Sequence, residues 1–156
     1  MKKKGALLAV AIVILLAVVL LPIPQHKDIL LQGARMAEGE LDESVTISVK
    51  GWYLNYALRE NEFRGTLTIK PFATETEDNA EYEIKQKLFS LSDSVKYISV
   101  FRYSEKLNEY VPANVYFSEN LEKVLIIDEE DKEAYYVAAS ETDADLIGLV
   151  DLFLKE

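Results

Sequence analysis

The stretch VTISVKGWYLNYAL at residues 45–58 decides the fold expected for this chain. Apolar residues occupy positions 45, 47 and 49 and alternate with polar ones, which is the period-two pattern of a strand with one buried face. After Gly51 the apolar residues move to positions 52, 54, 56 and 58. A β-bulge at Gly51 would insert one residue and keep the same face inward. We therefore predict one long bulged strand over residues 45–58, with two strands separated at Gly51 as the alternative.

Strand patterns recur further along the chain. They cover residues 63–70, 82–88, 95–103, 115–117, 124–127 and 134–139. Residues 95–103 have apolar side chains on both faces, which predicts a central strand covered on both sides. The acidic segment at residues 128–132 is expected to be a solvated hairpin tip.

The C-terminus has the clearest helical pattern. Its apolar face is formed by Leu146, Ile147, Val150, Phe153 and Leu154. Ser140 or Thr142 is expected to cap this helix, which would pack on the strand at residues 95–103. The predicted fold is α+β and mostly β, with an antiparallel sheet of about seven strands that forms a sandwich or a partial barrel and is closed by the helix.

The N-terminus has the pattern of a membrane anchor. Lys2–Lys4 precede an uncharged apolar run at residues 5–21, and Pro22 and Pro24 follow it. Such a run is long enough to span a bilayer as one transmembrane helix, and the lysines place its start in the cytoplasm. The expected domains are a lysine cluster and anchor at 1–24, a juxtamembrane spacer at 25–44 and an extracytoplasmic strand-rich domain at 45–156.

Cleavage of the N-terminal segment is the alternative for localisation. A secreted protein would result, but the sequence after the run lacks the small residues that a signal-peptide cleavage site needs. We therefore expect a single-pass protein of the cell membrane. A short helix near residues 29–36 is expected within the spacer.

Composition restricts the classes of function. The chain has 156 residues and no cysteine, which excludes disulfides, thiolate metal sites and a cysteine nucleophile. From Pro22 onward, 14 Lys and Arg stand against 27 Asp and Glu, a net charge of −13. This acidity excludes nucleic acid as a partner and disfavours contact with anionic lipid headgroups.

No residue pattern predicts a catalytic, cofactor or metal site. His26 is the single histidine, and it is expected to lie in the spacer outside the folded region, away from the partners that catalysis or metal binding needs. Residues 128–131 are all acidic but lack the spacing of a calcium loop, and Glu75, Glu77 and Asp78 have no better pattern. We therefore predict no cofactor and do not predict an enzyme.

Aromatic residues are the candidates for an interaction surface. They are Trp52, Tyr53, Tyr56, Tyr135 and Tyr136. Neighbouring aromatics in a strand face opposite sides of a sheet, so one of each pair is expected at the surface. Strands also favour aromatics for packing alone, which is the competing interpretation.

Four short segments carry a resemblance to other proteins. They are VKGWY at 49–53, FRGTLTI at 63–69, VYFS at 115–118 and VLII at 124–127, followed by the closing helix. In this order they resemble small, membrane-anchored, uncharacterised proteins of Gram-positive bacteria. The resemblance implies membrane anchoring and supplies no catalytic residue.

Two functional hypotheses follow. The first is a non-enzymatic interaction or accessory module of the cell envelope, attached to the membrane through residues 5–21, with another envelope protein as its partner. The alternative is a ligand-binding or sensing domain, whose pocket would lie between sheet and helix and be lined by Tyr and Trp.

Overall fold

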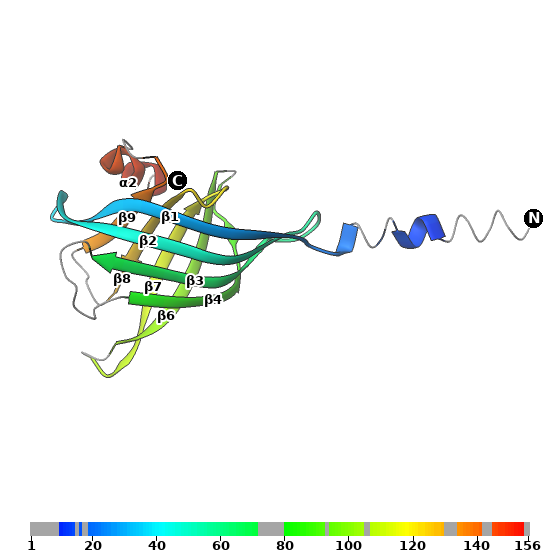
Figure 1. Cartoon of the computed structure of the whole chain (residues 1–156), viewed down its shortest axis with the longest axis horizontal. Coiled ribbons are helices and arrows are strands. Elements are labelled where there is room, and N and C mark those ends of the chain that lie inside the picture. Colours follow the sequence, from blue (N-terminus) through cyan, green and yellow to red (C-terminus); the bar gives the residue numbers. More distant parts are fainter. Residues whose placement is uncertain are drawn as a thin grey trace, which may run out of the picture.

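The structure is a computed structural model, and it describes residues 10–14, 16, 19–71, 80–92, 94–104, 107–129, 134–141 and 145–154. The described strands form one antiparallel sheet in the order β4-β3-β2-β1-β9-β8-β7-β6-β5 (Figure 1). The strands are β1 (Ile23–Ala37), β2 (Glu40–Asn55), β3 (Glu62–Pro71), β4 (Ala80–Lys87), β5 (Phe89–Ser90), β6 (Val95–Ser104), β7 (Glu109–Ser118), β8 (Lys123–Asp128) and β9 (Ala134–Ala139). The described sheet thus has nine strands and not about seven, because β1 and β5 were not predicted.

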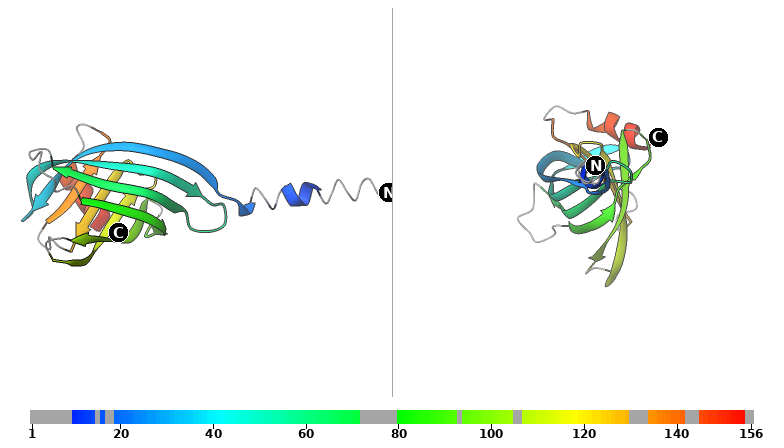
Figure 2. Two further views of the ribbon diagram at one scale, coloured as in Figure 1. Left: turned by 60° about the horizontal axis from the view of Figure 1, so that its bottom comes forward. Right: turned by 90° about the vertical axis from the view of Figure 1, so that its right-hand side faces the viewer.

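The sheet curls around one apolar interior. The β1–β9 ladder joins two meanders, and β4 of the first meander contacts β6 of the second. Figures 1 and 2 show the two meanders on opposite sides of this interior. The interior side chains include Leu31, Ile47, Phe63, Leu67, Tyr82, Ile98, Val115, Phe117 and Ile126. One curled layer, and not the two separate layers of a sandwich, therefore encloses this core.

The predicted spacer is part of the sheet. Residues 25–44, including the helix expected near 29–36, lie in β1, the following turn and β2. β1 pairs with β2 along its whole length and with β9 over its second half. Pairing with β2 and β9 supports the strand conformation of β1, whose sequence alternates weakly and is interrupted by charged residues. The folded region thus begins at Ile23 and not near Val45.

The predicted bulge at Gly51 is absent. β2 passes through Gly51 without a register shift, and Gly51 lies opposite Gly65 of β3. Tyr53 continues the inward-facing odd positions and is 6% exposed, whereas Trp52 points outward and is 50% exposed. A Cβ on Gly65 would lie 2.0 Å from the carbonyl oxygen of Lys50. The two glycines therefore allow a close approach of two strands, where a change of phase was expected.

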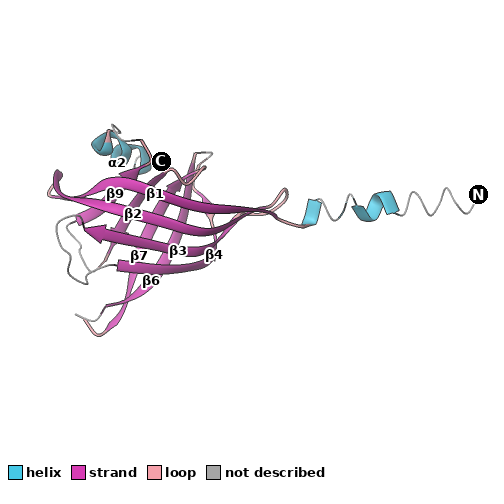
Figure 3. Cartoon of the chain, in the orientation of Figure 1, coloured by secondary structure: helices cyan, strands magenta, loops and turns pink. Residues whose placement is uncertain are grey.

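The C-terminal helix is confirmed, but its buried face differs from the prediction. The helix α2 (Leu146–Leu154) packs outside the sheet against β8 and β9 (Figure 3). Leu149, Val150 and Phe153 are buried, whereas Ile147 and Leu154 are exposed. The side chain of Asp145 caps the helix.

The capping bond runs from the backbone N–H of Gly148 to Oδ1 of Asp145 at 3.0 Å. Ser140 is not the cap, and Thr142 lies outside the described residues. The helix covers the beginning of β6, at Val95, whereas Phe101 and Tyr103 on the same outer face are exposed. The strand expected to be covered on both sides is thus covered mainly on one.

The N-terminal apolar run is only partly described. Residues 10–14, 16, 19 and 20 are helical, whereas residues 5–9, 15, 17 and 18 and Lys2–Lys4 lie outside the described residues. Over the positions that are described, the chain has no helix with the length and apolarity needed to cross a membrane.

Candidate functional site

The β6–β7 hairpin extends beyond its neighbour in the sheet. The last pair between β7 and β8 is Ala113 with Asp128, whereas β6 and β7 remain paired out to Ser104 and Glu109. The hairpin end therefore projects as two strands past the end of β8, at the lower left of Figure 1. Its inner face is still packed, because Ser104 and Val111 are buried.

The outer face of this hairpin carries large apolar side chains. Phe101 is 58% exposed and Tyr110 is 72% exposed, and Tyr103 and Leu107 are also exposed. We call these four residues the hairpin surface. The rings of Tyr103 and Tyr110 pack edge to face with centroids 5.5 Å apart, and the hydroxyl of Tyr103 donates a hydrogen bond to Oδ1 of Asn108. The exposed rings are therefore held in place before any partner binds.

The covered and open parts of the outer face meet along β6 and β7. The ring of Tyr97 packs on that of Tyr116 at 5.2 Å, and Tyr116 packs on Phe153 of α2 at 6.5 Å. Burial raises the pKa of Tyr116, with a smaller contribution from nearby Tyr97. Beyond these rings Phe101, Tyr103 and Tyr110 are exposed, and the main contacts of α2 are with β8 and β9. The hairpin surface is therefore exposed because α2 does not extend over the end of β6 and β7.

Three of the predicted aromatics lie near the beginning of β1. Trp52 is outward and packs on the ring of His26 at 5.1 Å, so His26 is part of the sheet and not outside the folded region. Tyr53 points inward, where its hydroxyl accepts a hydrogen bond from Nδ2 of Asn61 at 2.6 Å, and burial raises its pKa. The ring of Tyr56 lies 3.7 Å from the guanidinium of Arg59.

The other two predicted aromatics lie elsewhere and face different cores. Tyr135 packs under α2, and Tyr136 packs against the interior of the sheet. Adjacent aromatics therefore point to opposite faces as expected, but both faces are covered here. The structure does not bring the five predicted residues together into one surface.

The first residue of the acidic tip is buried, contrary to the prediction of a solvated segment. Asp128 ends β8 and is 2% exposed, and the hydroxyl of Tyr82 in β4 donates a hydrogen bond to its Oδ2 at 2.5 Å. This contact links the two meanders across the interior. Residues 130–133 lie outside the described residues, as do Glu75, Glu77 and Asp78. Among the described side chains, no three His, Cys, Asp or Glu residues are grouped closely enough to hold a metal ion.

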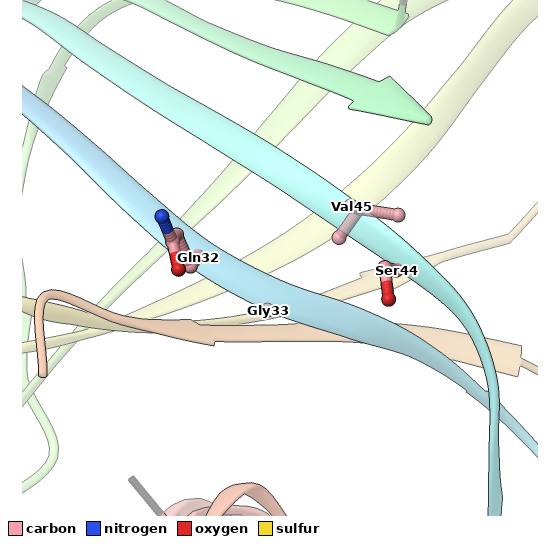
Figure 4. Close-up of a pocket in the computed structure, with 4 residues that line it drawn as sticks. All are labelled: Gln32, Gly33, Ser44 and Val45. Atoms are coloured by element: carbon pink, nitrogen blue, oxygen red, sulfur yellow. The ribbon is translucent and has the colours of Figure 1, made fainter. Parts of the chain in front are cut away.

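A hollow of about 270 Å³ lies on β1 and β2. Its lining residues are Gln32, Gly33, Ser44 and Val45 (Figure 4). None of them is aromatic or titratable, so this hollow is not the aromatic pocket expected between sheet and helix. Gly33 is required at this place, because a Cβ would lie 2.0 Å from the carbonyl oxygen of Val137.

Comparison of the chain with protein-family models, with curated proteins and with solved structures finds no match. The candidate site therefore rests on geometry alone. Sequence reasoning missed Phe101, Tyr103 and Tyr110, although the apolar pattern on both faces of residues 95–103 was the available signal. That pattern indicated a second buried face, whereas most of this face is open in the folded chain.

Proposed function

We propose that this chain is a non-enzymatic interaction or accessory module, anchored by residues 5–21 at the outer face of a cytoplasmic membrane. The hairpin surface is the single observation that carries the interaction role. The anchor is supported by the lysine cluster and the apolar run of the sequence. Another protein of the envelope is the proposed partner.

The chemistry of the hairpin surface supports a protein partner. Tyrosine and phenylalanine bury large areas at little cost in side-chain entropy, and they are enriched in the centres of protein interfaces. Phe101 and Tyr110 stand on paired strands whose other face is packed, so a partner meets a supported surface. Leu107 extends the same apolar surface to the turn.

The strand directions support a position of this surface away from the proposed membrane. β1 begins at Ile23, after the apolar run, and the neighbouring strands from β1 through β9, β8 and β7 to β6 run in alternate directions. The β6–β7 turn therefore lies at the end of the sheet opposite the start of β1 (Figure 1). This arrangement favours a partner in the envelope and not the chain's own bilayer.

Site-specific photo-crosslinking in whole cells tests the proposal. A photoreactive residue in place of Tyr110 is expected to form one discrete adduct, and Phe101→Ser in the same chain is expected to remove it. The matched control is the same photoreactive residue in place of Ile147, which is similarly exposed on α2. Adducts of equal yield at both positions, or none at either, would count against an interaction role for the hairpin surface.

A further inference from the structure

The β2–β3 connection lies level with the end of the N-terminal apolar run. Ile23 pairs with Asn55 at the beginning of β1, and residues 56–61 continue beyond that pair. We call residues 56–61 the proximal tip. In Figure 1 it reaches toward the point where β1 meets the N-terminal segment. If residues 5–21 span a bilayer, the tip therefore meets the surface of the same bilayer.

The proximal tip has the side chains of a membrane–water interface. Leu58 is 73% exposed, and Arg59 stacks on the ring of Tyr56. Aromatic rings and arginine favour the headgroup region, whereas an exposed leucine favours the acyl boundary below it. The side chain of Asn61 holds the tip in shape, because it accepts a bond from the backbone N–H of Tyr56 at 3.0 Å and donates one to Tyr53.

The surroundings of the tip do not share the acidic excess of the domain. Arg59, Arg64 and Lys87 stand against Glu60, Glu62 and Glu119, whose carboxylate acts on neighbouring Tyr53, so the charges are balanced. Two of the carboxylates are paired, with Arg64 Nε 2.7 Å from Glu62 and Lys87 Nζ 3.7 Å from Glu60. Arg64 and Lys87 thus neutralise the two carboxylates, and Arg59 stacks on Tyr56 beside them.

Acidic residues concentrate at the other end of the sheet. The β1–β2 turn and its flanks carry Glu38, Glu40, Asp42 and Glu43, with Arg35 as their cation. The net charge of the whole domain therefore says little about the proximal tip. An anionic surface would therefore repel the opposite end of the sheet and not the tip.

We propose that the proximal tip is a lipid-contact site that rests on the bilayer in which residues 5–21 are anchored. This inference rests on the proposed anchor. The anchor makes the contact intramolecular, so one leucine, one tyrosine and one arginine suffice for a contact that would be weak between separate molecules. The contact would orient the domain and hold the hairpin surface away from the membrane.

Trp52 is the single tryptophan of the chain, which makes the proposal directly measurable. The full-length chain is placed in nanodiscs of phosphatidylcholine and phosphatidylglycerol that carry a nitroxide on the headgroup. Three proteins are compared: the native chain, Trp52→Phe with Leu58→Trp, and Trp52→Phe with Tyr110→Trp. All three positions are exposed, so the new tryptophans disturb no core.

The expected order of quenching follows the order of height above the bilayer. The Leu58→Trp protein should lose about half of its emission or more and shift to the blue, the native Trp52 should lose less, and the Tyr110→Trp protein should be unaffected. Equal fractional quenching of the Leu58→Trp and Tyr110→Trp proteins, in chains that co-elute with the discs, would overturn the lipid contact alone. Failure to co-elute with the discs would instead overturn the proposed anchor, and the lipid contact with it.

A charge substitution provides the matched second test. Leu58→Glu should reduce the quenching of native Trp52 by about twofold, because a carboxylate is repelled by the anionic headgroups. Leu107→Glu is an equal change at the opposite end of the sheet and should leave the quenching unchanged. The same decrease in both variants would contradict contact at the tip.

Discussion

Gly65 shows how one residue limits the packing of the sheet. Gly65 has no Cβ, which leaves room for the backbone of Lys50 and Gly51. A Cβ at this position would lie 2.0 Å from the carbonyl oxygen of Lys50 and 2.7 Å from the Cα of Gly51. Gly65→Ala should therefore lower the free energy of unfolding by about 1–3 kcal/mol. Urea unfolding followed by Trp52 fluorescence measures this change. The neighbouring Thr66→Ala is the control, and equal midpoints for the two variants would contradict the close approach.

Tyr82 and Asp128 form the buried polar contact across the interior. Tyr82→Phe keeps the ring and removes only the hydroxyl that donates to the carboxyl group of Asp128. Because this acceptor is buried, we expect a loss of about 1.5–3 kcal/mol in unfolding free energy. Tyr103→Phe also removes a donated hydrogen bond, but at an exposed position, and should cost about 0.5 kcal/mol or less. Similar losses in both variants would argue against a structural role for the buried pair.

The burial of Tyr53 leads us to expect a loss of stability at alkaline pH. Burial raises the pKa of its hydroxyl in the folded chain, so folding favours the neutral form. Its contribution is therefore fully present below the unfolded pKa of about 10 and is lost as pH rises through the folded pKa. Tyr53→Phe should reduce the decline of the urea midpoint between about pH 9 and 11. Part of the decline should remain in this variant, because the pKa of Tyr116 is also raised. An unchanged pH profile would show that Tyr53 does not control it.

At the scale of elements, Phe153 is the largest side chain that holds α2 on the sheet. Phe153 is buried against the sheet and contacts the ring of Tyr116. Phe153→Ala should cost about 3 kcal/mol, and amide exchange along residues 146–154 should accelerate because the helix loses its main contact. Ile147→Ala, on the exposed side of the helix, should change neither quantity appreciably. Slow exchange in the Phe153 variant would mean that α2 is held by other contacts.

β1 illustrates why an element can escape prediction. Its interior residues are few, with Leu31 buried in the sheet interior and Met36 buried under α2. A strand that contributes to two cores shows no single alternating face, so the period-two pattern is lost. The register shift between Arg35 and Met36 separates these two parts. Pairing with β2 and β9 therefore determines a strand that local pattern does not reveal.

At the scale of the whole molecule, the exposed aromatics are expected to serve function and not stability. Phe101→Ser should leave the unfolding free energy within about 0.5 kcal/mol of the parent. Phe117→Ser, in the interior on β7, should cost about 3 kcal/mol or more. Urea midpoints of the two variants give the comparison. A large loss from Phe101→Ser would mean that the hairpin surface belongs to the fold.

The sequence by itself determined seven of the strands, the C-terminal helix and the concentration of acidic residues. Alternation and helical spacing are local properties, so residues 63–70 and 146–154 reveal their secondary structure without reference to neighbours. Only the tertiary structure decided the inward direction of Tyr53, the burial of Asp128 and the open outer face at Phe101. Each depends on a partner from another element: Gly65 of β3 lies opposite Gly51 where the bulge was expected, the hydroxyl of Tyr82 in β4 meets Asp128, and α2 covers β8 and β9 but not the end of β6. Periodicity shows that a face is apolar, whereas long-range packing decides whether anything covers it.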